Sequence, residues 1–140
     1  MKAPLEARIF SEMVSFMQQV QRAADAALAG TGVSPAQFFI LSALARQGPQ
    51  QQSKVAAQLG VTAANVSQLL VKLADAGLVQ RHAQGKAKVV SLTANGNKLV
   101  TQLQPAHEKF LRSRFEPLKT DERVALLATL HRLTGGGGGV

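Results

Sequence analysis

The chain has 140 residues, 46% of them hydrophobic, which is about one domain's worth of a globular protein that can bury its own core. It contains no cysteine, which excludes disulfides, thiolate metal sites and a cysteine nucleophile. Lysine and arginine exceed aspartate and glutamate by 16 to 8, and the formal net charge of +8 favours an acidic partner, either nucleic acid or an anionic membrane.

Residues 5–29 predict a long amphipathic helix, because apolar residues recur there at steps of three or four and neither Pro nor Gly interrupts them. Gly30 ends this helix. Residues 34–37, Ser-Pro-Ala-Gln, are typical of a helix start, in which the serine caps the helix and the glutamine closes a capping box. The stretch from Phe38 to Leu44 is apolar on nearly every side, so we expect this second helix, which Gly48 ends, at the centre of the core.

Two shorter helices are predicted next. Residues 52–59 have room for about two helical turns, and Gly60 ends them. Thr62 can cap the following helix, which runs to about residue 76, and Gly77 is its stop signal. The apolar residues of this helix share one face and are expected to be buried: Val66, Leu69, Leu70 and Leu73.

Residues 78–82 and 87–92 have β-forming sequences and are joined by residues 83–86, which predicts a short hairpin. Thr93 can cap another long helix, which extends from about residue 94 to residue 115. The apolar residues expected on one side of that helix are Leu99, Leu103, Ala106, Phe110 and Leu111.

The last helix is predicted to begin with Thr120 as its cap, and Asp121 and Glu122 are placed favourably against the positive end of its dipole. Its apolar stripe consists of Val124, Leu127, Leu130 and Leu133. The glycine run that follows cannot repay its ordering entropy, so we expect residues 135–140 to form a flexible tail.

The positive charge is concentrated in the middle of the chain. Residues 35–93 hold six basic residues against Asp75, a net charge of +5, whereas residues 1–34 balance and residues 94–140 hold seven bases against four acids, a net charge of +3. The middle segment is therefore predicted to face a polyanion. On charge alone an alternative stays open, in which scattered Lys and Arg only keep the surface soluble.

Two short helices broken by a glycine and followed by a basic hairpin match a winged helix-turn-helix. The outer face of the second helix offers Asn65 and Gln68, whose amides can pair bidentately with adenine in the major groove. Ser67 and Lys72 are better suited to phosphates. The alternative is an ordinary amphipathic helix with a solvated polar face, and the adjacent hairpin and the charge bias disfavour it.

Four segments make the chain resemble the MarR family of bacterial transcriptional regulators, and the resemblance covers about residues 5–133. Their order and spacing carry it: Ser34-Pro35-Ala36-Gln37-Phe38, Val55-Ala56-Ala57-Gln58-Leu59-Gly60-Val61, Leu73-Ala74-Asp75-Ala76-Gly77-Leu78-Val79 and Val89-Val90-Ser91-Leu92-Thr93-Ala94-Asn95-Gly96.

The resemblance implies a mainly α fold with a small β-hairpin. Residues 34–93 would form the winged helix-turn-helix DNA-binding region, and residues 1–33 and 94–134 a helical dimerisation region. It also implies an obligate homodimer on a pseudo-palindromic operator in double-stranded DNA, and commonly a repressor that a small, often aromatic, anion releases. The apolar stripes at both ends of the chain independently favour a dimer, because one subunit's core cannot cover them all.

The family's DNA-reading positions fall on Ala63, Ala64, Asn65, Ser67 and Gln68 of the recognition helix and on Lys86 and Lys88 of the wing; Lys72 and Arg81 complete the predicted DNA-binding set. This sequence departs from the family pattern in several places. Alanines stand where Arg or Ser is frequent, and Gln68 stands where Arg is frequent, which leaves fewer charges to read guanine or to grip phosphate. The wing is a few residues shorter, and Gln51 replaces a capping Thr or Ser.

The remaining signals are weaker. A ligand crevice between the winged helix and the terminal helices is predicted with Phe16, Phe38 and His107 in its lining. His82, His107 and His131 share no ligand spacing, so we expect no metal, and we expect no cofactor and no enzymatic activity.

No apolar run reaches the ~18 residues of a membrane span, and we expect a cytoplasmic protein with no membrane partner. An alternative function is a helical interaction module that uses its basic face for a protein or membrane partner.

Overall fold

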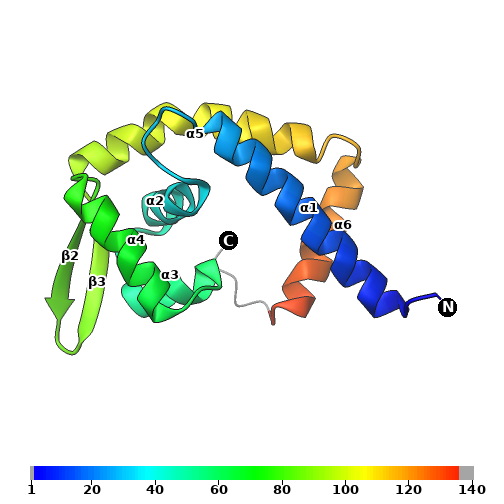
Figure 1. Cartoon of the computed structure of the whole chain (residues 1–140), viewed down its shortest axis with the longest axis horizontal. Coiled ribbons are helices and arrows are strands. Elements are labelled where there is room, and N and C mark those ends of the chain that lie inside the picture. Colours follow the sequence, from blue (N-terminus) through cyan, green and yellow to red (C-terminus); the bar gives the residue numbers. More distant parts are fainter. Residues whose placement is uncertain (1, 136–140) are drawn as a thin grey trace.

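The computed structural model describes residues 2–135, and this part of the chain forms six α-helices and three short β-strands (Figure 1). The elements, in chain order, are α1 (Leu5–Ala27), α2 (Pro35–Gln47), β1 (Gln50–Gln51), α3 (Gln52–Leu59), α4 (Ala63–Asp75), β2 (Val79–Gln84), β3 (Ala87–Leu92), α5 (Ala94–Arg114) and α6 (Thr120–Leu133). The mainly helical fold with a small sheet that the sequence predicts is confirmed. Of the glycine tail, residues 136–140 lie outside the described residues.

The elements divide between two ends of the molecule (Figure 1). The β2–β3 hairpin lies at one end, beside α4, and the N-terminal part of α1 and α6 lie at the other. Helix α5 runs along one edge from the base of the hairpin to the turn before α6, and α2 lies in the middle. The long α5 therefore joins the hairpin end of the fold to the end that holds α1 and α6.

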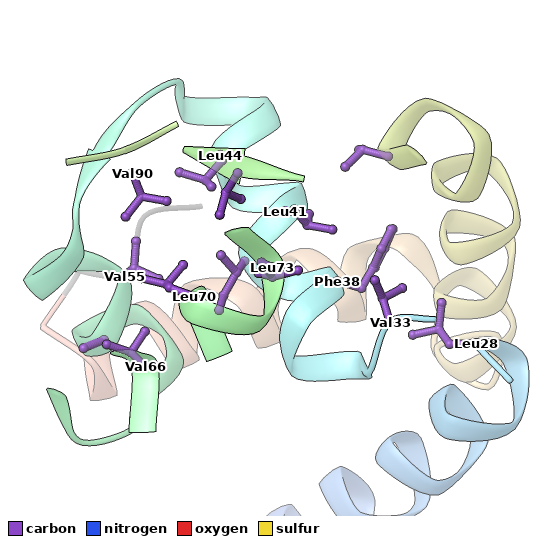
Figure 2. Packing of buried hydrophobic residues seen from close by; sticks show 14 residues of the cluster. Leu28, Val33, Phe38, Leu41, Leu44, Val55, Val66, Leu70, Leu73 and Val90 are labelled. Atoms are coloured by element: carbon purple, nitrogen blue, oxygen red, sulfur yellow. The ribbon is translucent and has the colours of Figure 1, made fainter. Parts of the chain in front are cut away.

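Helix α2 is the centre of the core, as its all-round apolar sequence predicts. Phe38, Ile40 and Leu41 are at most 1% exposed. Around α2 pack apolar side chains from the neighbouring helices and from the sheet, among them Val55, Val66, Leu70, Leu73 and Val90 (Figure 2). Fully burying one Leu, Ile or Phe stabilises a fold by roughly 1.5–3 kcal/mol, so α2 anchors the other elements.

Most of the predicted helix caps are present. The Ser34 hydroxyl accepts from the Gln37 N–H, and the Gln37 side chain accepts in return from the Ser34 N–H, which is the expected capping box. Thr62 accepts from the Asn65 N–H at 3.2 Å. Thr93 accepts from the Gly96 N–H at 3.1 Å. These bonds fix where α2, α4 and α5 begin.

The starts of α6 and α3 differ from those of α2, α4 and α5. The expectation that Thr120 caps α6 is wrong: Lys119 is the N-cap, and its N–H donates to Glu122 Oε1 at 2.9 Å, so that Thr120 is the first helical residue. Thr120 therefore lies inside the first turn, and its hydroxyl no longer precedes the N–H groups from which a capping side chain accepts. At α3, Gln51 makes no side-chain capping bond, in keeping with the missing Thr or Ser.

The sheet is antiparallel with the strand order β1-β3-β2. Its β2–β3 register pairs Gln84 with Ala87, so the connection is a two-residue turn, Gly85-Lys86, and not the predicted four-residue loop. Gly85 has φ 63°, which the first position of a tight type II′-like hairpin turn requires. The two-residue strand β1 was not predicted, because its polar sequence, Gln50-Gln51, carries no strand signal.

The apolar side of α5 is shifted from its predicted composition. Ala106 is exposed, whereas Val100, which was not expected to face inward, is 5% exposed. Leu99 and Leu103 pack against the core as partly buried residues, as expected. The N-terminal half of α5 thus packs on the core, while its C-terminal half extends towards α6 (Figure 1).

Candidate DNA-binding interface

Helix α4 has one buried face and one exposed face. Val66, Leu70 and Leu73 are at most 1% exposed and hold the helix to the core. Five of the side chains predicted to face DNA lie on the exposed side: Ala63, Ala64, Asn65, Gln68 and Lys72. The division of this helix into an inner and an outer face therefore follows the sequence pattern.

The outer face of α4 is hollowed. A shallow hollow of about 640 Å³ is lined by Ala64, Ser67, Gln68, Val71 and Lys72. Sequence reasoning missed Val71, whose side chain is 43% exposed. The signal was its position three residues after Gln68, which places both side chains on one face of the helix.

The wing lysines lie beside the start of the helix-turn-helix. A second cavity, of about 280 Å³, is lined by three elements: Gln51, Gln52 and Ser53 at the start of α3, Ala63 and Val66 of α4, and Lys86, Ala87 and Lys88 of the hairpin. The fold thus brings two exposed wing lysines close to Ala63, 23 residues earlier than Lys86 in the chain. Positive charge and the first turn of α4 share one cleft.

Arg81 points towards the two helices of the helix-turn-helix. Its Nη2 donates to Gln52 Oε1 at 3.2 Å and to Ser67 Oγ at 3.4 Å. Its Nε is buried and has no hydrogen-bond partner. A buried donor without a partner destabilises the fold by about 1–3 kcal/mol. Arg81 and Ser67, both in the predicted DNA-binding set, are half-buried and bonded to each other.

The three side chains predicted to line a ligand crevice separate into two places. Phe38 and His107 form an edge-to-face pair with ring centroids 4.8 Å apart, whereas Phe16 packs on Phe115 at 5.5 Å. Burial lowers the pKa of His107; the charge of Glu108 raises it and that of Arg46 lowers it again. This lowered pKa favours the uncharged imidazole, which makes His107 a poor cation for an anionic ligand.

A third cavity lies between α5 and α6. Its volume is about 330 Å³, and it is lined by Leu111, Arg112, Phe115, Arg123, Leu126, Leu127 and Leu130. The Arg123 guanidinium is partly engaged, because its Nε donates to the Phe115 carbonyl at 3.0 Å. The lining is mostly apolar, and Leu126 and Leu127 are also exposed.

Comparison with known proteins identifies the architecture. A helix-turn-helix transcriptional regulator of Bacillus subtilis strain 168, YkoM, is 28% identical over 104 residues, which are 72% of this chain and 68% of that protein. Residues 31–88, which contain the whole of α2, α3, α4 and β2, match the model of the MarR family. Over this segment, 58 of its 140 residues, the chain is similar to the MarR family.

Two solved structures share the fold of this chain. BpsR of Bordetella bronchiseptica, whose DNA binding is regulated by 6-hydroxynicotinic acid, superposes with a TM-score of 0.81 at 23% identity, over 91% of this chain and 98% of that one. MepR of S. aureus, solved in complex with DNA, gives a TM-score of 0.76 at 22% identity, over 96% of this chain and 99% of that one.

These similarities indicate a DNA-binding transcriptional regulator and not an enzyme. Within residues 2–135, no helix is both long and apolar enough to cross a membrane. In the same part of the chain, no three His, Asp or Glu side chains are grouped so that they could hold a metal ion.

Proposed function

We propose that this regulator is a homodimeric repressor that inserts α4 of each subunit into the major groove of a pseudo-palindromic operator. The observation that carries the proposal is the exposed amide face of α4, with Asn65 and Gln68, beside a wing that bears Lys86 and Lys88. Amide side chains suit base edges, and lysines suit phosphates. In the proposed division, residues 34–93 bind DNA, and residues 1–33 with 94–134 join the subunits.

Exposed apolar side chains at the other end of the molecule support the dimer. On α1 the exposed set is Leu5, Ile9, Phe10, Met13, Val14 and Met17, and on α6 it is Val124, Leu126, Leu127 and Leu133. Large apolar patches on a soluble chain mark interaction surfaces. A two-fold contact would bury both sets on each subunit and would place two α4 helices about one turn of DNA apart, ~34 Å.

Gln68→Ala tests the reading role of α4. The loss of an amide that pairs with a base is expected to cost about 1–3 kcal/mol of operator binding and to relax the preference at one or two base pairs per half-site. Fluorescence anisotropy on the operator and on its single-base variants measures both effects. Gln102→Ala, exposed on α5, is the matched control and should bind as the parent does. If affinity fell equally on all DNA sequences, Gln68 would instead contact the DNA backbone and not a base.

Lys86→Ala tests the role of the wing. An exposed lysine that neutralises one phosphate releases counterions, so its removal is expected to weaken binding to all sequences alike. The slope of log K against log salt should flatten by about 1 per subunit. A titration over several salt concentrations provides the slope, and an unchanged slope would mean that the short hairpin does not reach the DNA.

We further propose that an aromatic acid releases the repressor from DNA. The support comes from the Phe38–His107 ring pair and the nearby Arg46, a cation that already acts on the His107 pKa, and from the regulation of the similar protein BpsR by 6-hydroxynicotinic acid. The carboxylate of the ligand would pair with the exposed Arg46, and the ligand ring would lie against His107, the half-buried member of the ring pair.

Calorimetry and thermal unfolding test this site with 6-hydroxynicotinic acid and with salicylate. Ligand at a hundred times its Kd should stabilise the protein by about 2.7 kcal/mol and weaken operator binding. Nicotinamide, which lacks the carboxylate, should do neither, and Arg46→Met should abolish the response. If both acids give no binding heat and no thermal shift, the proposal is refuted.

A further inference from the structure

We propose that α4 reads half-sites built from A·T pairs. In this assignment the amides of Asn65 and Gln68 pair with adenine, and the apolar side chains of Ala64 and Val71 contact the 5-methyl group of thymine. The inference rests on the proposed function, because it takes α4 as the element that enters the major groove. Beyond that function, the inference states which base pairs α4 recognises.

The first argument is the chemistry that the exposed face of α4 offers. Guanine is read best by Arg or Lys, and cytosine by a carboxylate. The charged residues of α4 are Lys72 and Asp75, both in its last turn. Lys72 is assigned to a phosphate, to which its ammonium group is better suited. The part of α4 that precedes it, residues 63–71, holds no Arg, Lys, Asp or Glu, so it has no charged side chain to select a G·C pair.

The second argument concerns Arg81, whose guanidinium contacts α4. Bidentate recognition of guanine needs two free N–H groups that project outward together. Nη2 of Arg81 is already bonded to Gln52 Oε1 and Ser67 Oγ, and Nε is buried. The fold therefore holds this arginine against the body of the domain instead of presenting it to a base.

The third argument is the apolar surface on the outer side of α4. Ala64, Gln68 and Val71 follow each other at i, i+4 and i+7 and line the same hollow. Val71 is 43% exposed there, between the polar Ser67, Gln68 and Lys72. The thymine methyl is the apolar group that the major groove presents, and contact with small apolar side chains is how proteins recognise it. A glutamine flanked by two apolar residues thus matches adjacent adenine and thymine edges.

The experiment begins with selection of bound sequences from random duplex DNA by the intact protein at physiological salt. The expected product is an inverted repeat with A·T pairs at the α4 contact positions. Those pairs are then replaced one at a time by inosine·cytosine, which looks like G·C in the major groove and like A·T in the minor groove. Affinity should fall roughly 5- to 150-fold per pair, the loss also expected for a G·C pair at the same position.

Thymine methyls are tested without altering the protein. Uracil in place of a contacted thymine should weaken binding about fourfold, the factor for one buried methyl group. Uracil between the two half-sites is the matched control and should have no effect. Val71→Ala, at a position exposed enough to tolerate the change, should remove the uracil penalty at its own thymine while leaving the others.

The outcomes separate this inference from the function on which it rests. A selected inverted repeat with G·C pairs at the α4 positions, or full tolerance of inosine·cytosine, would overturn the A·T assignment and leave the proposed dimeric DNA reader intact. Absence of a uracil effect at every contacted thymine would overturn the methyl contacts. If no sequence is enriched and Gln68→Ala changes nothing, the proposed function itself fails.

Discussion

Phe10→Glu and Leu127→Glu are each expected to give a folded monomer whose affinity for the operator is reduced more than a hundredfold. The two side chains are 68% and 47% exposed in the single chain, so a carboxylate at either position leaves the fold of one subunit intact. In the proposed dimer both positions are covered. An unpaired charge buried there costs about 3–5 kcal/mol, and each 1.4 kcal/mol is about a factor of ten in the association constant.

Analytical ultracentrifugation at low micromolar concentration measures the dimer, and circular dichroism checks that each variant remains folded. Ser11→Glu is the matched control, because it adds the same charge to an exposed polar position next to Phe10 on α1. It should remain dimeric and bind the operator as the parent does. A parent protein that sediments as a well-folded monomer and still binds one half-site tightly would disprove the dimer.

Gly96→Ala is expected to destabilise the protein by about 3 kcal/mol, at the upper end of overpacking effects. A Cβ at this buried position would lie 2.0 Å from the Leu78 carbonyl oxygen and 3.1 Å from Leu92 Cδ2. The obstructing oxygen belongs to the backbone and accepts a hydrogen bond from the Thr93 N–H, so it cannot rotate away. Alanine would gain about 1 kcal/mol in helix propensity, which is too little to offset the clash.

Urea unfolding measures this loss, and Asn95→Ala, one residue earlier and exposed, should change stability by less than about 0.5 kcal/mol. Operator binding by Gly96→Ala should weaken as well, because α5 joins the hairpin to the helices of the proposed dimer region. A variant that is more stable than the parent would show that helix propensity outweighs the contact with Leu78.

Much of the fold could be predicted because its signals are local. Ser34, Thr62 and Thr93 each bond to the N–H three residues later, so a stretch of four residues determines the start of each helix. The glycines at 48 and 60 adopt the positive φ that ends a helix and that other residues avoid. The 3.6-residue periodicity then separated the buried Val66 from the exposed Gln68.

The tertiary structure decided what depends on residues far apart in the chain. The sequence predicts that Arg81 is one more cation that binds DNA. In the folded chain its guanidinium donates to Gln52, 29 positions away, and to Ser67. Phe16 packs on Phe115 and not with His107, because the middle of α1 and the C-terminal end of α5 meet only in the folded chain. Periodicity and capping describe neighbours within about one helical turn; the partner of a long side chain is set by which elements pack together.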